Sequence, residues 1–469
     1  MMINAGIART VAAIGGAIAS FGIVLAPSEL AAESEATQRL KERNAEFEKD
    51  IIRVSYSVYT AVGYGVSTVS MIEGTDGVVI VDTGIDAISG AEIREDFRDI
   101  VDKPIKAIIF THGHGDHIGG VSAFVDSPET EIWARDGFGH EQRFLESAGI
   151  RIQTRRGAMQ AGFMLSPEQR INNGVARAYW PRRGAGVFEK GQKIPPTHFH
   201  KDGRHRLEVA GLELDLVATG GETQDHLYVW FPDEKIAFTG DNFYKSWPNL
   251  YAIRGTEYRN ILHWIDAIDN VLAEEPSAVV GGHTRPIVDA KDARKTLTNY
   301  RDAIEFVFMK TVEGINKGMT PNQLVEYVEL PNKFQKLDYL QPYYGNPEWA
   351  IRAIFSGYLG WFDGNATNLF PLSDVEEAKR LADLAGGVDA LVQKTTEALA
   401  EDDNQWAAQL SDHVLAIEPD NETALSVKAE ALTALAETKL TATARNYYLS
   451  TAIQLRKRVN EGDSSAPSD

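Results

Sequence analysis

Short runs of β-branched and aromatic residues alternate with turn residues and helical segments from about residue 51 to residue 287. "VSTVSMIEGTDGVVIVDTG" predicts a hairpin that turns at Thr75-Asp76-Gly77, and "LYVWFPDEKIAFTGD" predicts a second one that turns at Pro232-Asp233. Each of "IKAIIFT", "LELDLVAT" and "SAVVGGH" predicts one further strand. Strands interleaved with helices in this way predict an α+β domain with two mixed sheets and helices outside them.

The pattern changes near Gly314, after which apolar residues recur at helical spacing. Gly and Asp pairs, and the Pro-Asp pair in "IEPDNET", interrupt this pattern and predict the ends of successive helices. "WAAQLSDHVLAIEPDNETALSVKAEALTAL" resembles one tetratricopeptide-type helix pair, which is too little for a solenoid. We therefore expect a mixed domain over residues 40–310, an all-helical, TPR-like domain over 314–458 and a disordered tail over 459–469, where the sequence is small and polar.

Residues 1–32 predict a secretory signal peptide. Arg9 precedes an apolar run rich in Gly and Ala, and the first acidic residue is Glu29, as is typical of export signals. The alternative is an uncleaved membrane anchor, because the run is close to the shortest length that spans a bilayer. No later stretch is long and apolar enough to span one, so we expect an exported, periplasmic protein with no stable membrane span after signal removal.

Charge and cysteine content narrow the chemistry. The formal net charge of −20 over 469 residues argues against a nucleic-acid partner, which needs a basic footprint. The chain has no cysteine, which excludes disulfides, thiolate metal sites and a cysteine nucleophile. Any metal ion must therefore be held by nitrogen and oxygen ligands.

Three of the 11 histidines and one aspartate lie within six residues of "IKAIIFTHGHGDHIGG", directly after a predicted strand. His112 and His114 are two residues apart, so an extended chain projects both imidazoles to one side. Asp116 and His117 follow where the chain turns toward a helix, so they can address a neighbouring point. This arrangement predicts two adjacent transition-metal positions with nitrogen and oxygen ligands.

This His-x-His-x-Asp-His run resembles the signature of the metallo-β-lactamase fold, an αβ/βα sandwich that uses one or two zinc ions. By this resemblance, Asp82 in "VVIVDTG" is the aspartate that contacts the metal ligands without itself binding the metal. Glu222 in "TGGETQDH" occupies the position where a third histidine is usual. Asp225 and His226 are near alternatives to Glu222. The implied ligands of two zinc ions are His112, His114 and Glu222 for the first, Asp116, His117 and His283 for the second, and Asp241 with a hydroxide as the bridge.

Glu222 in place of histidine, together with "PNLYAIRG" and "YLQPYYGNPEWAIRAIFSGYLGWFDGN", resembles the zinc-dependent alkyl sulfatases of this fold, which have a helical dimerisation domain. The resemblance implies that Asn249 and Arg254 hold the sulfate, and an arginine fork does match a tetrahedral oxyanion. It also implies a homodimer through the helical domain, although the apolar helix faces could instead pack on the chain's own first domain. The sterol-carrier-like domain that often follows in this family is not expected in this chain.

Two positions depart from the family pattern. Asp241 is one methylene shorter than the glutamate that more often bridges the metals, and Pro248 stands where a histidine could protonate the leaving oxygen. Lys245, Tyr244, Tyr251 or a zinc-bound water would have to replace that proton donor. Residues 153–165 are expected either to form a partly apolar wall at the pocket mouth or to pack in the core.

The sequence therefore predicts a zinc-dependent sulfuric ester hydrolase that converts alkyl sulfate esters to an alcohol and inorganic sulfate through a metal-bridging hydroxide. A hydrolase of another ester, a lactone, a β-lactam or a phosphodiester is the alternative within the same fold. A scaffold that binds partners and has lost catalysis is a third possibility. Nitrogen and oxygen sites also accept manganese, iron or cobalt.

Overall fold

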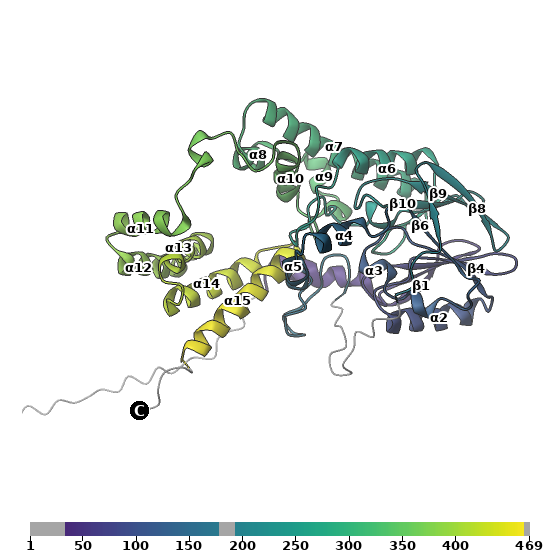
Figure 1. The fold of residues 1–469 in the computed structure, drawn as a ribbon, viewed down its shortest axis with the longest axis horizontal. Helices are drawn as coiled ribbons and strands as arrows, with labels where there is room; N and C mark the ends of the chain where they lie inside the picture. The colour runs from purple at the N-terminus through teal and green to yellow at the C-terminus, as the bar shows by residue number, and fades with distance from the viewer. Residues whose placement is uncertain (1–32, 178–192, 464–469) are drawn as a thin grey trace, which may run out of the picture. The chain divides into compact units, whose positions relative to one another are not determined.

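The computed structural model describes residues 33–177 and 193–463 (Figure 1). The predicted signal peptide and residues 464–469 lie outside the described residues. Helix α15 runs from Ala442 to Asp463, so residues 459–463 of the predicted tail are helical instead of disordered. The polar composition of this segment predicted disorder, but Val459 packs against the core of the helical domain. None of the described helices combines the length and the apolar character that crossing a membrane requires.

The first sheet has seven strands in sequence order, antiparallel from β1 to β4 and parallel from β4 to β7. The predicted hairpin at residues 74–77 joins β3 to β4. The strands are β1 (Asp50–Arg53), β2 (Val58–Val62), β3 (Val69–Glu73), β4 (Val78–Val81), β5 (Ile105–Ile109), β6 (Glu131–Arg135) and β7 (His198–His200). β7, which carries His198 and His200, lies at the edge of this sheet.

The second sheet has five strands in the order β12-β11-β10-β9-β8, antiparallel except for the parallel pair β11–β12. The second predicted hairpin joins β10 to β11. The strands are β8 (Arg204–Val209), β9 (Leu212–Ala218), β10 (Leu227–Phe231), β11 (Ile236–Phe238) and β12 (Ala278–Val280). Both sheets are thus mixed, as predicted.

The two sheets pack face to face. Val79 and Ile109 of the first sheet share one buried cluster with Leu214, Val229 and Phe238 of the second. The outer face of the first sheet is covered by α2 (Ala87–Ile100), and that of the second by α6 (Ile261–Ala273) and α7 (Ala290–Asn316). This arrangement confirms the predicted αβ/βα sandwich, and the apolar runs of β4 and β5 reflect strands that are buried on both faces.

Beyond α7 the described chain is helical. The predicted breaks separate α11 from α12 at Gly386-Gly387, α12 from α13 at Asp402-Asp403, and α13 from α14 at Pro419-Asp420. Both glycines have positive φ, which favours glycine over other residues at this break. The helices are α8 (Pro321–Tyr327), α9 (Asn332–Gln335), α10 (Pro347–Leu359), α11 (Asp374–Ala385), α12 (Val388–Ala400), α13 (Asn404–Ile417) and α14 (Glu422–Glu437), followed by α15.

The last helix returns to the first domain, where α15 packs against α5 (Figure 1). The Asn446 amide donates to the carbonyls of Gln160 and Asn172 at 3.2 and 3.1 Å. The remaining helices of the described chain are α1 (Glu35–Glu42), α3 (Gly115–Ile118), α4 (His140–Ser147) and α5 (Ile152–Gln160), and the 3₁₀ turns are η1 (Arg43–Phe47), η2 (Val121–Ala123), η3 (Gly240–Asn242), η4 (Asp338–Leu340) and η5 (Ala366–Leu369).

Candidate active site

Loops at the ends of strands from both sheets bring the predicted metal ligands together. His112 and His114 follow β5, and Asp116 and His117 lie on the short helix α3. Glu222 lies in the turn between β9 and β10. Asp241 lies on η3 after β11, and His283 follows β12. These loops can form one site because the strands that precede them end on the same side of the sandwich.

Glycines let these loops approach closely. Gly240 has a φ of +50°, and a Cβ there would lie 2.8 Å from Thr111 and 2.7 Å from His226 Nε2. A Cβ on Gly282 would lie 2.0 Å from Asp241 Oδ1. A larger residue at Gly240 would push η3 away from the end of β5, and one at Gly282 would push Asp241 away from the loop after β12.

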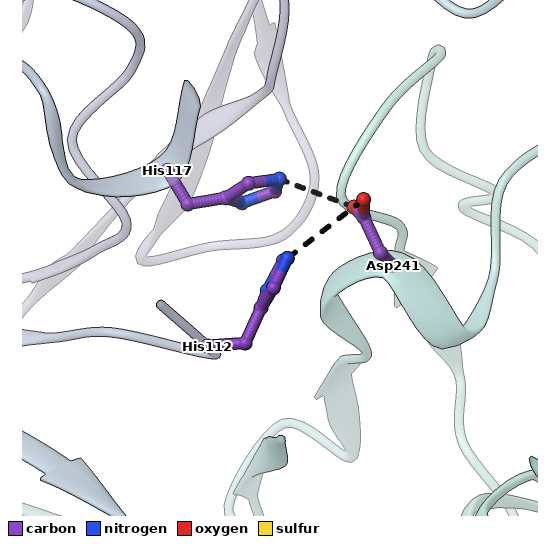
Figure 2. A group of neighbouring side chains, drawn as sticks. All are labelled: His112, His117 and Asp241. Carbon is purple, nitrogen blue, oxygen red and sulfur yellow. Dashed lines mark ion pairs between the residues drawn. The ribbon is translucent and has the colours of Figure 1, made fainter. Parts of the chain in front are cut away.

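Asp241 is at the centre of the cluster. Figure 2 shows the imidazoles of His112 and His117 pointing at its carboxylate. His117 Nε2 lies 3.2 Å from Oδ1, while His283 Nε2 and His112 Nε2 lie 3.2 and 3.9 Å from Oδ2. The two oxygens of Asp241 thus face different histidines, as a carboxylate between two metal ions would.

The other ligands lie around this centre. Asp116 Oδ2 is 3.8 Å from His117 Nε2 and 3.7 Å from His283 Nε2. His114 Nδ1 is 3.7 Å from Glu222 Oε1. All seven predicted ligands fall into three groups whose ligand atoms lie within 4.8 Å of one another: His112, His117 and Asp241; Asp116, His117 and His283; and His114, Glu222 and Asp241.

The ligands predicted for the second metal ion, Asp116, His117 and His283, thus form one of these groups. The ligands predicted for the first metal ion are divided between two groups, because His112 lies with His117 and Asp241, and His114 lies with Glu222. Asp225, an alternative to Glu222, accepts a hydrogen bond from Gly139 N at 2.7 Å. The other alternative, His226, directs Nδ1 at Asn242 and stacks on His112.

The donor set fits divalent metal ions. His112 Nε2, His117 Nε2 and Asp241 Oδ1 are buried without a hydrogen-bond partner, which is costly unless something else satisfies them. The opposite ring nitrogens are engaged: His117 Nδ1 pairs with Asp82 at 2.7 Å, and His283 Nδ1 donates to Val66 O at 2.7 Å. These contacts put the proton on Nδ1 and leave the Nε2 lone pair for a metal ion.

Burial and charge favour the metal-binding forms of two of these groups, His112 and Asp241. Burial tends to lower the pKa of His117 and His283, but the Asp241 carboxylate outweighs it and raises both. Burial, reinforced by His117 and His114, lowers the pKa of His112 well below its ordinary value, which keeps this imidazole neutral. Burial opposes ionisation of Asp241, but His283 and His117 outweigh it and hold the pKa of the carboxyl well below its usual range. Burial raises the pKa of Glu222 to about 7 in spite of Arg259, so a bound cation would be needed to keep it fully ionised at neutral pH.

A cavity of about 510 Å³ opens beside the cluster. His114, Asp116, Glu222 and Asp241 lie on one side of it, together with Arg254. The apolar residues that line it are Val66, Ile85, Leu145, Ile150, Ala161 and Phe163. The cavity therefore joins a polar floor to a partly apolar wall.

The wall comes largely from α4, α5 and the turn that follows α5. Gln153, Ala161 and Phe163 of the predicted wall segment line the cavity, whereas Met159 and Leu165 are buried in the core. Both interpretations of residues 153–165 are thus correct for part of that segment.

The two predicted sulfate ligands lie in different surroundings. Arg254 lines the cavity, and its Nη2 lies 3.3 Å from His114 Nε2. Asn249 is buried, donates its N–H to Tyr244 Oη at 2.7 Å and accepts from Arg259 Nη1 at 2.6 Å through its carbonyl. It is not among the described residues that line the cavity.

None of the three predicted proton donors lines the cavity in the described part of the chain. Lys245 Nζ lies 3.2 Å from Glu46, and the ring of Tyr244 packs edge-on against His283. Tyr344, which was not among the predicted site residues, lines the cavity. Burial and the nearby Glu222 raise the pKa of its phenol, which therefore stays protonated.

Two charged residues at the site were also missed. Arg259 is buried and donates from Nη1 to Glu222 Oε2 as well as to Asn249 O. Glu141 on α4 accepts from Arg254 Nη1 at 2.9 Å. Arg259 could have been noticed because it lies five residues after Arg254 in the same stretch, whereas nothing around Glu141 in the sequence marks it.

Comparisons with known proteins agree with this geometry. The metallo-beta-lactamase superfamily profile matches residues 62–283, and the profile described as alkyl sulfatase dimerisation matches residues 320–458. A linear primary-alkylsulfatase of Pseudomonas is 33% identical over 400 residues, which cover 84% of this chain and 74% of that protein. An (R)-specific secondary-alkylsulfatase of Pseudomonas is 28% identical over 432 residues, which cover 89% of this chain and 64% of that protein.

The fold comparison gives the same result. The solved structure of a stereoselective inverting sec-alkylsulfatase of Pseudomonas matches with a TM-score of 0.82 and 27% identity, over 90% of this chain and 67% of that one. The match extends through both the sandwich and the helical domain. The chain belongs to the alkylsulfatase family of the metallo-β-lactamase superfamily, a family of sulfuric ester hydrolases.

Proposed function

We propose that this protein hydrolyses alkyl sulfate esters to an alcohol and inorganic sulfate. The observation that carries the proposal is the position of Arg254, whose guanidinium lies beside the metal-ligand cluster at the polar end of a cavity with an apolar wall. A charged head group and an alkyl chain on one substrate match the two parts of this cavity. The names of the Pseudomonas relatives support the same substrate class.

Two zinc ions are the proposed cofactors. His112, His114 and Glu222 would hold one, Asp116, His117 and His283 the other, and Asp241 both. When bound, they would lower the pKa of a coordinated water and so supply hydroxide at neutral pH.

The residues of the chain would then orient the substrate. Arg254 would bind the sulfate oxygens through charge-assisted hydrogen bonds, and Asn249 behind it would fix that stretch of backbone through its contacts with Tyr244 and Arg259. Leu145, Ile150 and Phe163 would contact the alkyl chain and exclude water. Tyr344 Oη, a protonated phenol in the cavity, is placed to donate a hydrogen bond to the leaving oxygen.

The remaining properties are proposals that rest on the sequence. We infer that residues 1–32 direct export to the periplasm, that residues 40–310 form the catalytic unit, and that residues 314–458 mediate a homodimer. The alkyl sulfatase dimerisation profile supports the last of these.

The test is a panel of alkyl and aryl sulfates supplied to the purified, zinc-loaded protein in oxygen-18 water. Inorganic sulfate should be released, and the position of the label should show whether carbon or sulfur is attacked. Arg254→Ala should lower kcat/KM about 10- to 100-fold, because charged hydrogen bonds contribute about 1.5–3 kcal/mol.

Arg151→Ala is the matched control, since Arg151 is an exposed arginine beside α5 that does not line the cavity. The control should leave kcat/KM unchanged. Release of no sulfate from any ester would refute the proposal, and equal effects of the two substitutions would refute the role of Arg254.

A further inference from the structure

Glu141 lies between the two arginines of the site. Its Oε1 is 2.9 Å from Arg254 Nη1, and its Oε2 is 4.0 Å from Arg259 Nη2. Oε1 also lies 3.4 Å from His114 Nε2. Since Arg259 pairs in turn with Glu222, carboxylates and guanidinium groups alternate in the order Glu222, Arg259, Glu141, Arg254.

This carboxylate faces the cavity. Glu141 is 8% exposed, and it lines the cavity together with Arg254. Any anion that binds to Arg254 must therefore lie close to a second negative charge. An arginine that only had to bind anions tightly would be better without such a neighbour.

The effect of Glu141 depends on the charge of the ligand. In the low-dielectric surroundings of a buried site, repulsion between like charges at a few ångströms is strong, and it doubles when the ligand carries two charges instead of one. A sulfate monoester carries one negative charge, whereas a phosphate monoester carries nearly two at neutral pH. Two guanidinium groups alternate with two carboxylates, so these four groups contribute no net positive charge that could offset the second negative charge of a dianion.

We propose that Glu141 is a specificity-determining residue that selects monoanionic sulfate esters over dianionic phosphate esters. This inference rests on the proposed function, because it assigns the charge class of the head group bound at Arg254. Glu141 lowers the affinity of the site for all anions and lowers it more for dianions. The cost in affinity for the sulfate ester is offset by the exclusion of phosphate esters of the same chain length.

The experiment measures binding, without turnover, of decanesulfonate and decylphosphonate to the zinc-loaded protein by calorimetry. At about pH 9 the sulfonate is a monoanion and the phosphonate is a dianion. Glu141→Gln keeps the shape and the hydrogen bond to Arg254 while removing the charge. It should raise the affinity for the phosphonate at least about tenfold relative to the sulfonate. Metal–phosphonate contacts are the same in both proteins and cancel in this ratio.

Glu95→Gln is the matched control, because Glu95 is an exposed carboxylate of α2 that does not line the cavity. It should leave the ratio unchanged. Equal weakening of both ligands by Glu141→Gln would mean that Glu141 only positions Arg254, and would overturn the inference, as would an unchanged ratio.

A measurement on the unsubstituted protein keeps the test valid if Glu141→Gln does not fold. Lowering the pH to about 6 should strengthen phosphonate binding relative to sulfonate binding as the phosphonate gains a proton. Tighter binding of the dianion would overturn the inference. If the unsubstituted protein binds neither ligand, the proposed sulfate site itself fails, which distinguishes that result from a failure of selectivity.

Discussion

The Asp82 carboxylate orients two of the histidine rings, although it lies outside the group of ligands around Asp241. Asp82 lies directly after β4, and its φ of +58° is a left-handed conformation. Oδ1 accepts from Thr111 N, and Oδ2 accepts from Thr111 Oγ1 at 2.9 Å and pairs with His117 Nδ1 at 2.7 Å. Because the Thr111 hydroxyl donates to Asp82, its oxygen is left to accept from His112 Nδ1, 3.0 Å away. One carboxylate thus orients both imidazoles.

We expect Asp82→Asn to lower zinc affinity about 10- to 100-fold, as is typical when the hydrogen-bond partner of a metal-binding histidine is changed. Asparagine tolerates the left-handed backbone, so the fold should survive. Its NH₂ group would face His117 Nδ1 and favour the tautomer with the proton on Nε2, where a metal ion should bind. Competition with a chromogenic chelator measures the affinity.

Asp86→Asn is the control for this substitution. Asp86 caps α2 by accepting from Ser89 N at 2.8 Å, and asparagine caps helices equally well. Zinc affinity should not change. Retention of full affinity in Asp82→Asn would show that the tautomer of His117 does not depend on this carboxylate.

At the residue scale, the sequence predicted the site residues where the spacing of residues fixes the direction of their side chains. The i, i+2 spacing of His112 and His114 after a strand is a local pattern, and Glu222 could be found because the family resemblance supplied its place. Glu141 and Arg259 are 118 positions apart, and only the packing of α4 against the loop after η3 brings them together. No periodicity or spacing encodes such a contact.

At the level of elements, hairpins and helix breaks followed from turn residues and from periodicity of two or 3.6, which act over a few residues. These local signals did not predict that the helical domain contributes residues to the site. Thr443 of α15 and Tyr344 before α10 both line the cavity, whereas the sequence predicted only dimerisation or packing against the first domain for these helices. Polar residues of α15, which by their type would be expected at the surface, instead donate hydrogen bonds to backbone carbonyls of α5.

We expect Asn446→Ala to destabilise the protein by about 1–3 kcal/mol, because two buried carbonyls would lose their donor. Looser packing of α5 should also raise KM for dodecyl sulfate, since Gln160 at the end of α5 accepts a hydrogen bond from Arg254 N at 3.1 Å. Urea denaturation and the KM value provide the measurements.

Gln409→Ala is the comparison, since Gln409 is an exposed residue of α13 in the same domain. It should change stability by less than about 0.5 kcal/mol. If Asn446→Ala were equally neutral, α15 would not support the cavity wall.

For the whole molecule, several exposed apolar residues gather at the end of α10 and in the segment that leads to α11. Phe370 is 95% exposed, Trp361 75% and Leu359 54%. Exposed apolar side chains that cluster in this way are typical of protein–protein contacts. The segment lies inside the matched alkyl sulfatase dimerisation region, residues 320–458. The alternative of packing against the chain's own sandwich does not apply to these three side chains, which remain exposed.

We therefore expect a homodimer that Trp361→Glu combined with Phe370→Glu converts to a monomer. Two buried aromatic anchors contribute about 2 kcal/mol or more each to an interface, and burying a carboxylate in place of each would add a further penalty. Light scattering coupled to size exclusion should give twice the chain mass for the unsubstituted protein and the chain mass for the variant. Ile100→Glu, which places the same charge on an exposed apolar site of α2, should remain dimeric. A dimer that survives the double substitution would place the interface on another face of the helical domain, and an unsubstituted monomer would refute the homodimer altogether.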